Sequence, residues 1–197
     1  MIILFGLAGS GKGTQGKALS EVFGWRWLSV GEAIRQHGGY EEIINNGGLI
    51  PDEDVIKLMD KQIKKAEDEG FDVILDGYPR DKAQAEYIMS NMSDKIDGAI
   101  IPEVPKEELY QRLALRGRDD DKERASIDKR FEIFEQNIYS ILPLLEAKNI
   151  PIERVDGVGK IEEVTKRLTN VVKQMNPDAT EQLQDVNGGE IEKSYGE

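Results

Sequence analysis

A glycine-rich segment close to the amino terminus constrains this chain more than any other stretch. The apolar run Ile2 to Phe5 is followed by GLAGSGKGT at residues 6–14, after which the apolar positions take helical spacing. A short apolar run closed by glycine is typical of a buried parallel strand. A glycine-rich loop between a strand and a helix directs backbone N–H groups and the positive helix end toward one anion. We therefore predict a P-loop, in which Lys12 reaches the outer phosphates of a nucleotide.

This loop departs from the usual P-loop pattern at one position. Gly6, Gly11 and Lys12 fit the spacing G-x-x-x-x-G-K, but Gly13 follows the lysine and the hydroxyl comes one residue later, at Thr14. The alternative is a tight turn between strand and helix that binds nothing. Four glycines and one lysine within nine residues, directly after a strand, favour the phosphate site.

Composition excludes several other kinds of site. The 197 residues include no cysteine, which excludes disulfides, a thiolate nucleophile and a structural zinc held by cysteine. This composition fits a reducing compartment, and we expect a cytoplasmic monomer built as one domain. His37 is the only histidine, and we expect it on the solvated surface.

Charge and hydropathy exclude two classes of partner. Lys and Arg number 26 against 38 Asp and Glu, so the net charge is −12 and we expect no nucleic-acid partner. No apolar run approaches the length of a membrane span, and the amino terminus has neither a basic lead-in nor a cleavage site. We therefore expect no membrane segment and no signal peptide.

Positive charge is nevertheless concentrated in one segment. Five of the ten arginines fall within nineteen residues: Arg112, Arg116, Arg118, Arg124 and Arg130. In so acidic a chain, this segment is a second place where phosphate can be held. The alternative is a solvated face that pairs with Asp119 to Asp121, although such surface pairs stabilise by only about 0–1 kcal/mol. Pairing in the unliganded protein is compatible with phosphate binding.

Strand-like and helical patterns alternate along most of the chain. We expect strands at 2–5, 27–30, 71–76, 98–101 and 151–155, and helices at 13–23, 51–69, 81–92, 105–115, 123–148 and 161–175. This order predicts an α/β fold with a parallel five-stranded sheet flanked by helices, and ligands at the carboxyl ends of the strands. We expect Pro143 to kink the longest helix or to break its last turn.

Three segments interrupt this regular pattern. Glycine pairs at 38–39 and 47–48 leave room for only about two helical turns between them, so residues 31–58 predict a small helical insertion that moves on glycine hinges. Residues 116–122 form a very short charged loop. Residues 176–197 hold six acids and one lysine, and we expect a disordered or loosely attached acidic tail after a domain at 1–175.

Taken together, these motifs resemble the adenylate kinases, within the nucleoside monophosphate kinases. The resemblance covers about Met1 to Val172 in collinear order. Its motifs are Gly6-x-x-Gly9-x-Gly11-Lys12-Gly13-Thr14-Gln15, Ser29-x-Gly31-x-x-x-Arg35, Asp76-Gly77-Tyr78-Pro79-Arg80-x-x-x-Gln84, Arg112-x-x-x-Arg116 and Arg118-x-Asp120-Asp121, followed by Arg130. The resemblance implies a P-loop kinase fold, with 31–58 as the insertion that binds the nucleoside monophosphate and 116–122 as a minimal lid. The implied reaction is reversible transfer from MgATP to AMP, giving two ADP.

The same resemblance implies roles for single residues. ATP would be bound by Gly9, Ser10, Gly11, Lys12, Gly13, Thr14, by Arg112 stacked on the adenine, and by the carbonyl of Gly159 at its amino edge. AMP would be bound by Ser29, Val30, Arg35, Gly48, Leu49, Ile50, Gly77, Tyr78, Pro79, Arg80, Gln84, Arg118 and Arg130. The catalytic cations would be Lys12, Arg80, Arg116, Arg118 and Arg130, and Asp76 would hold Mg²⁺ through water.

The acceptor base stays open at this stage. Gln84 stands where the family has a glutamine that reads adenine, and an amide that donates and accepts suits that base. The family's usual threonine, however, is Val30 here, and pyrimidine-specific relatives also lack it. We expect AMP, with UMP or CMP as the alternative. A module that only binds a nucleotide is a further alternative, but it would not need Arg80, Arg116 and Arg130 beside Lys12.

The lid is the second departure from the family pattern. Only Gly117 separates Arg116 from Arg118, which is shorter than the family's short lid. We therefore expect poorer exclusion of water and some ATP hydrolysis. Counting back from Arg130 at the family's spacing reaches a neighbouring aspartate, so Arg118 matches only with a shift of one residue, and Arg124 is the alternative.

Overall fold

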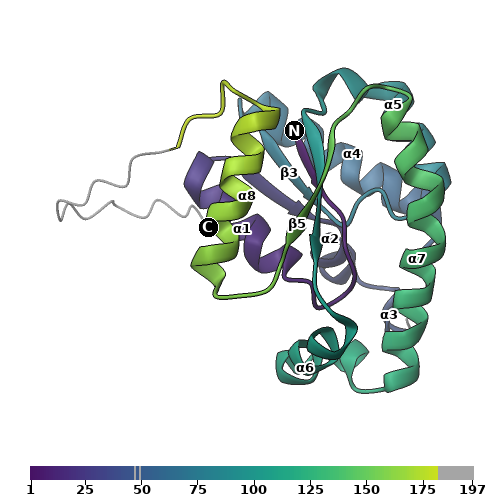
Figure 1. Cartoon of the computed structure of the whole chain (residues 1–197). Coiled ribbons are helices and arrows are strands. Elements are labelled where there is room, and N and C mark those ends of the chain that lie inside the picture. Colours follow the sequence, from purple (N-terminus) through teal and green to yellow (C-terminus); the bar gives the residue numbers. More distant parts are fainter. Residues whose placement is uncertain (47, 49, 182–197) are drawn as a thin grey trace, which may run out of the picture.

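Five parallel strands form one sheet with β1 at its centre. The strands are β1 (Ile2–Leu4), β2 (Arg26–Ser29), β3 (Val73–Asp76), β4 (Gly98–Glu103) and β5 (Ile152–Asp156), in the order β2-β3-β1-β4-β5. The computed structural model describes residues 1–46, 48 and 50–181. Leu4 lies beside Asp76 on one side and Ile100 on the other, so the strands end along one edge of the sheet (Figure 1). The expected five-stranded parallel sheet is confirmed.

Helices cover both faces of this sheet. One face carries α1 (Lys12–Phe23) and α8 (Ile161–Met175). The other carries α4 (Asp52–Asp68), α5 (Lys82–Asn91) and α7 (Arg124–Glu146). The remaining elements are α2 (Val30–His37), α3 (Glu41–Asn45), α6 (Lys106–Arg116) and the two 3-10 turns η1 (Ser93–Lys95) and η2 (Asp119–Asp121).

Alternate strand residues supply the two apolar layers of the core. Ile2 and Leu4 pack with residues of α1 and α8, whereas Ile3 packs with residues of α4, α5 and α7. All three side chains of β1 are fully buried. Because both faces are covered, a central strand has no solvent side, and this explains why it reads as a continuous apolar run in the sequence.

One predicted boundary is wrong, and one of the two alternatives for Pro143 is excluded. Val30 begins α2 instead of ending a strand, because the Ser29 hydroxyl caps this helix by accepting a hydrogen bond from the Glu32 N–H (3.5 Å). Pro143 does not end α7, which continues to Glu146. The Tyr139 carbonyl that Pro143 cannot bond belongs to a residue that is 79% exposed, where water can take that bond. The predicted charged loop contains the short turn η2.

The predicted insertion shares the main core of the protein. Residues 31–58 include most of α2, all of α3 and the start of α4. Ile34, Ile50 and Val55 belong to the same apolar cluster as Ile3 of the central strand. Gly38 and Gly39 have φ values of 73° and 83°, a left-handed conformation that favours glycine, whereas the predicted hinge motion stays a prediction. His37 beside them is exposed, as expected.

The chain beyond α8 folds back for a few residues. The Asn176 side-chain amide donates to Asp97 (3.1 Å), and Ala179 packs against the apolar cluster under α8. The rest of the predicted tail, residues 182–197, lies outside the described residues. In the portion of the chain that is described, no helix is both long enough and apolar enough to cross a membrane.

Gly16→Ala should destabilise the fold, although alanine is the better helix former. A Cβ on Gly16 would overlap Cδ1 and Nε1 of the Trp27 ring. Replacing a helical glycine gains about 1 kcal/mol, whereas overpacking costs about 1–3 kcal/mol. We expect a lower midpoint in urea unfolding. In a Trp27→Leu background the same substitution should raise the midpoint, and a rise in the wild-type background would contradict the packing of Trp27 on α1.

Candidate active site

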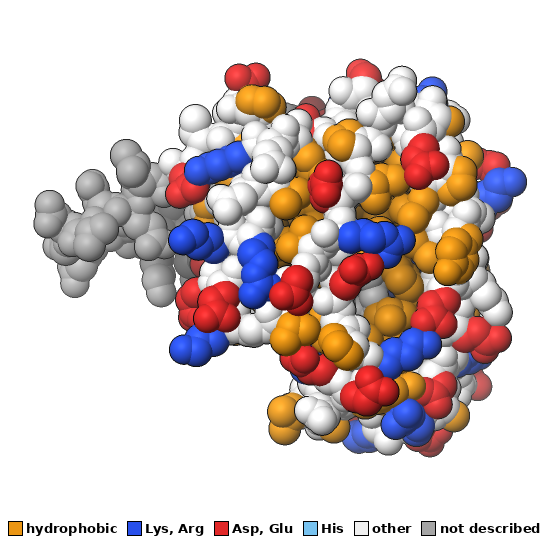
Figure 2. Space-filling model, in the orientation of Figure 1, with side chains coloured by type: hydrophobic (Ala, Val, Ile, Leu, Met, Phe, Trp, Pro, Cys, Tyr) orange, Lys and Arg blue, Asp and Glu red, His pale blue; other side chains and the backbone are white. Residues whose placement is uncertain are grey.

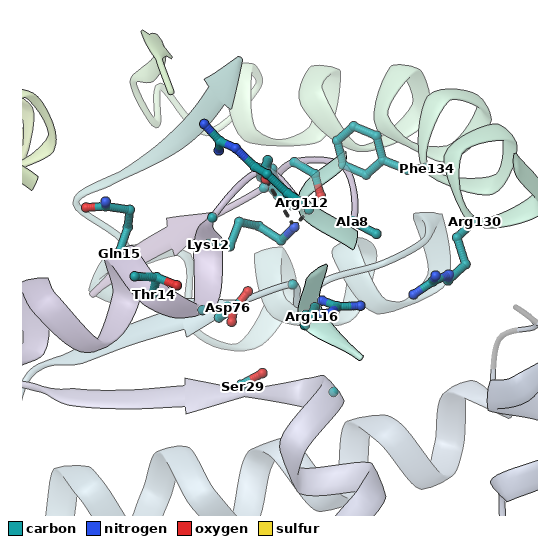
Figure 3. Close-up of a pocket in the computed structure, with 18 of the residues that line it drawn as sticks. Ala8, Lys12, Thr14, Gln15, Ser29, Asp76, Arg112, Arg116, Arg130 and Phe134 are labelled. Carbon is teal, nitrogen blue, oxygen red and sulfur yellow. Dashed lines mark hydrogen bonds between the residues drawn. The ribbon is translucent and has the colours of Figure 1, made fainter. Parts of the chain in front are cut away.

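A cavity of about 780 Å³ opens where the strands end. The P-loop after β1, Ser29 at the end of β2 and Asp76 at the end of β3 form one side of it. Arginines of α6 and α7 approach from the other side (Figure 3). This edge is where parallel α/β sheets bind their ligands, and the cavity therefore lies where the sequence predicts it.

Most predicted site residues line this one cavity. Those that do are Gly9, Ser10, Gly11, Lys12, Gly13, Thr14, Ser29, Arg35, Gly48, Ile50, Asp76, Gly77, Pro79, Arg80, Arg112, Arg116, Arg118, Arg130 and Gly159. Val30, Tyr78 and Gln84 are buried behind its wall. Leu49 lies outside the described residues.

Backbone conformation shapes the P-loop for an anion. Gly9 and Gly11 have φ values of 85° and 90°, which only glycine adopts readily. A Cβ on Gly9 would also lie 3.0 Å from the Leu109 carbonyl oxygen, so α6 leaves no space for a side chain there. Helix α1 begins at Lys12, directly after a glycine that offers no capping side chain. The first N–H groups of α1 are therefore available to a phosphate.

The ammonium group of Lys12 is folded back on its own loop. Its Nζ donates to the carbonyl oxygens of Gly6 (2.6 Å) and Leu7 (2.8 Å). Burial lowers the pKa of Lys12 from 10.5 to about 8, with a further lowering from Arg80 and other guanidiniums, while Asp76 opposes it. A phosphate beside Nζ would replace this repulsion with attraction.

Arg80 is fixed at the opposite wall by its backbone and its side chain. Its Nε donates to the Gly77 carbonyl (3.0 Å), and its carbonyl accepts a hydrogen bond from the Asn137 amide on α7 (3.0 Å). Burial lowers the pKa of Arg80, and the charges of Arg35 and Arg130 lower it further, against Asp76. Because an arginine remains protonated near neutral pH even when its pKa is lowered, this guanidinium keeps its charge. The neighbouring positive charges favour an anion beside it.

Two aspartates of η2 hold the arginines of α6 and α7. Asp121 accepts two hydrogen bonds from Arg116 (2.6 and 2.7 Å) and one from Arg130 (2.7 Å). Arg130 also donates to the carboxylate of Asp120 (2.8 Å). Burial raises the pKa of Asp121, but the hydrogen bonds from the two arginines outweigh it and keep this pKa below its usual value. The guanidiniums are thus oriented before any ligand arrives.

Arg118 and Arg124, the two alternatives for one arginine of the family motif, lie in different places. Arg118 lines the cavity, where its charge adds to burial in lowering the pKa of Arg35. Arg124 instead lies 3.3 Å above the centre of the Tyr110 ring and donates to Asp128 (3.2 Å). Because that group is not among the lining residues, only Arg118 can contact a ligand in the cavity as it stands.

Gln84 braces the Arg80 loop from behind. Its Oε1 accepts a hydrogen bond from the Arg80 N–H (2.9 Å), and its Nε2 donates to Asp52 (2.9 Å) and Asp81 (2.8 Å). Only 1% of the residue is exposed. Both amide hydrogens are already donated, so the side chain would have to release Asp52 or Asp81 before it could read a base.

Asp76 and Thr14 supply oxygen donors suited to Mg²⁺. Both line the cavity, and a Cβ on Gly13 between them would lie 3.6 Å from Asp76 Oδ2. Among the described residues, no group of three or more acids, histidines or cysteines could form a protein metal cage. This donor set fits Mg²⁺, which is often held by one or two carboxylates, water and substrate phosphates.

The excess of cations belongs to the cavity and not to the surface as a whole. Among the described lining residues are eight cationic and four acidic side chains, in a chain whose net charge is −12. On the face shown in Figure 2, red and blue side chains are intermixed instead of forming a patch of one sign. An anion is therefore attracted to this cavity more than to that face.

Sequence reasoning missed several residues that line the cavity. Glu108 lies one helical turn before Arg112, and that i,i+4 spacing of opposite charges was a usable signal. Phe134, Ile138 and Ile141 also line the cavity, from the apolar side of α7. Periodicity indicates which helix face turns inward, but it cannot tell a packed core from a cavity wall.

A parallel sheet with a P-loop and facing arginines defines a P-loop nucleotide-binding protein. The family model described as adenylate kinase matches residues 4–180. An adenylate kinase of Thermus thermophilus is 32% identical, over 85% of this chain and 94% of its own. One from Synechococcus sp. is 32% identical, over 85% and 95%, and one from Porphyromonas gingivalis is 34% identical, over 87% and 94%. The chain belongs to the adenylate kinase family.

Nucleotide affinity should fall as the pH rises through about 8, because the pKa of Lys12 is lowered to about 8. Below that pH the ammonium is already charged, whereas above it the bound phosphate must draw a proton onto Nζ. The loss should approach tenfold per pH unit. Calorimetry of ATP binding between about pH 7 and 10 measures this slope. The Lys12→Met variant should bind ATP more weakly, and its affinity should not fall with pH above about 8. If the affinity of this variant fell with pH as steeply as that of wild type, the titrating group would not be Lys12.

Proposed function

We propose that this protein transfers the terminal phosphoryl group of MgATP to AMP, reversibly, and forms two ADP. The observation that carries the proposal is the convergence of Lys12 and Arg80 with Arg116 and Arg130 on one cavity, in a chain of the adenylate kinase family. Phosphoryl transfer needs little covalent chemistry from a protein, but it needs two nucleotides in line and charge compensation between them.

The donor nucleotide lies along the P-loop in this proposal. The loop N–H groups and Lys12 bind its phosphates, and Arg112 and Gly159 border the place of its adenine. Mg²⁺ neutralises phosphate charge when it is bound, and Asp76 and Thr14 are the residues that would hold it. Lys12 would leave the carbonyls of Gly6 and Leu7 to meet the phosphate, because an anion compensates the ammonium charge and these neutral carbonyls do not.

The transferring phosphoryl group lies between the two walls. Arg116 approaches it from α6, Arg118 from the link between α6 and η2, and Arg130 from α7. Asp120 and Asp121 fix the angle of two of these guanidiniums, those of Arg116 and Arg130. A planar guanidinium binds two phosphate oxygens at once, and a charge fixed in advance stabilises a spreading anion without reorganisation. This arrangement supports a catalytic function for the arginines.

The acceptor nucleotide lies at the Arg80 side. Arg80 and Arg35 bind its phosphate, while Ile50 and Gly48 border its base. Gln84 reads adenine if the base replaces Asp52 as a partner of its amide. Residues 31–58 are the insertion that closes over this nucleotide, and residues 116–122 are the lid over the donor. Both substrate sites are built from one chain, which supports a monomer.

A coupled assay of ADP formation with each nucleoside monophosphate tests this function. We expect AMP to be preferred over GMP, UMP and CMP by at least about tenfold in kcat/KM, a difference expected when a buried polar group reads the base. A preference for UMP or CMP would keep the mechanism but transfer the acceptor assignment. A sample without any monophosphate measures the ATP hydrolysis expected from a short lid. ADP formation that does not depend on any of the four monophosphates would contradict a kinase.

Arg80→Ala should lower kcat by at least about a hundredfold, which corresponds to about 2.7 kcal/mol in the activation free energy. The substitution removes a fixed positive charge that stabilises the reacting phosphates. Arg154→Ala is the matched control, since Arg154 is an exposed arginine of β5 that pairs with Glu103 away from the cavity. The control should retain the wild-type rate. A loss of less than about threefold in Arg80→Ala, or under 1 kcal/mol, would contradict a catalytic role.

A further inference from the structure

The guanidinium of Arg112 is fixed in one plane by two different parts of the fold. Its Nε donates to Glu108 Oε1 (3.0 Å), and its NH2 group also donates to that oxygen. The same NH2 group donates to the Gly157 carbonyl (3.2 Å), in the segment between β5 and α8. Three of the five N–H groups are therefore used, and those of NH1 remain.

The remaining edge of the guanidinium is directed toward the P-loop. A Cβ on Gly11 would lie 3.8 Å from Arg112 NH1. Figure 3 shows the Arg112 side chain extending along the cavity above Lys12, with Gln15 nearby. Gln15 in turn donates to the Ile161 carbonyl (3.2 Å), and Ile161 lines the cavity at the start of α8. The guanidinium and the start of α8 therefore both border the cavity beside the P-loop.

We propose that Glu108 is a positioning residue that makes Arg112 a flat platform for the base of the donor nucleotide. Its carboxylate fixes the guanidinium plane and compensates its charge, so that Arg112 presents its face to the base and only its NH1 edge to the phosphates. This inference rests on the proposed function, because it assumes that the donor nucleotide lies along the P-loop.

A plain surface ion pair would be the simpler interpretation of Glu108 and Arg112. Their side chains are 33% and 28% exposed and are spaced i,i+4, and a pair of this kind contributes little to stability. The hydrogen bond from Arg112 to the Gly157 carbonyl indicates a function beyond that of a surface ion pair. A Cβ on Gly157 would lie 2.8 Å from Val104, and the Gly157 N–H donates to the Glu103 carbonyl (2.8 Å), so the carbonyl that Arg112 meets is itself fixed. Both charged residues also line the cavity.

Two probes separate a base platform from a phosphate ligand. ATP carries a base, whereas inorganic tripolyphosphate carries the same phosphates without one. Removing Glu108 frees the guanidinium and leaves the cavity more positive. We therefore expect Glu108→Ala to weaken ATP binding by about tenfold, in line with the loss of a stacking contact, while tripolyphosphate binds as in wild type or more tightly.

The experiment is calorimetry of both probes with wild type, Glu108→Ala, Glu108→Gln and Glu107→Ala, each with a urea midpoint to verify folding. Glu108→Gln keeps an acceptor oxygen but loses the charge, and it should lie between wild type and alanine for ATP. Glu107 is exposed and absent from the cavity wall, so its variant should match wild type with both probes. In steady-state assays Glu108→Ala should raise the KM for ATP and leave kcat and the KM for AMP unchanged.

Equal weakening of ATP and tripolyphosphate would overturn the platform, because the loss would then lie in the phosphate site. Unchanged ATP binding in Glu108→Ala would also overturn it. Failure of the proposed function has a different signature, since wild type itself would then form no ADP from ATP and AMP. A wild type that turns over normally beside an unaffected Glu108→Ala variant would reject this inference alone.

Discussion

Repulsion among cations that face one cavity is the constraint on which this site depends. Lys12, Arg80, Arg116 and Arg130 act on one another strongly enough that the last three all lower the pKa of Lys12. Such charges remain together in a folded protein only where counter-charges or hydrogen bonds compensate them. The fold provides both, through Asp76 at the end of β3 and through Asp120 and Asp121 in η2. A polyphosphate would add the remaining compensation.

The way each cation is held matches its position in the cavity. Lys12 bonds to the carbonyls of its own loop, which are neutral partners that a phosphate can replace at little cost. Arg116 instead meets a buried carboxylate with two hydrogen bonds. Asp121 also accepts a hydrogen bond from Arg130, so one buried carboxylate orients two guanidiniums. The site therefore combines one lysine that can move with arginines that are already in place.

Much of the fold and of the site could be predicted from the order of residues. The continuous apolar run of β1 predicts a strand covered on both faces, and the P-loop glycines predict where that strand turns into a helix. The element boundaries that failed depended on single local contacts. The Ser29 cap on α2 is one, and the exposure of Tyr139, which lets α7 continue past Pro143, is another. Both are decided by differences of about 1 kcal/mol, which residue patterns do not resolve.

By itself the sequence determined the sheet, the P-loop and most of the cationic residues that line the cavity, because these follow from periodicity, from local backbone requirements and from recognisable motifs. Tertiary structure alone decided how those side chains are used. It brought Arg118 and not Arg124 to the cavity, turned Gln84 onto Asp52 and Asp81, and placed the Gly157 carbonyl beside Arg112. Each of these outcomes depends on which groups from distant segments meet, and on the requirement that polar groups removed from water find partners.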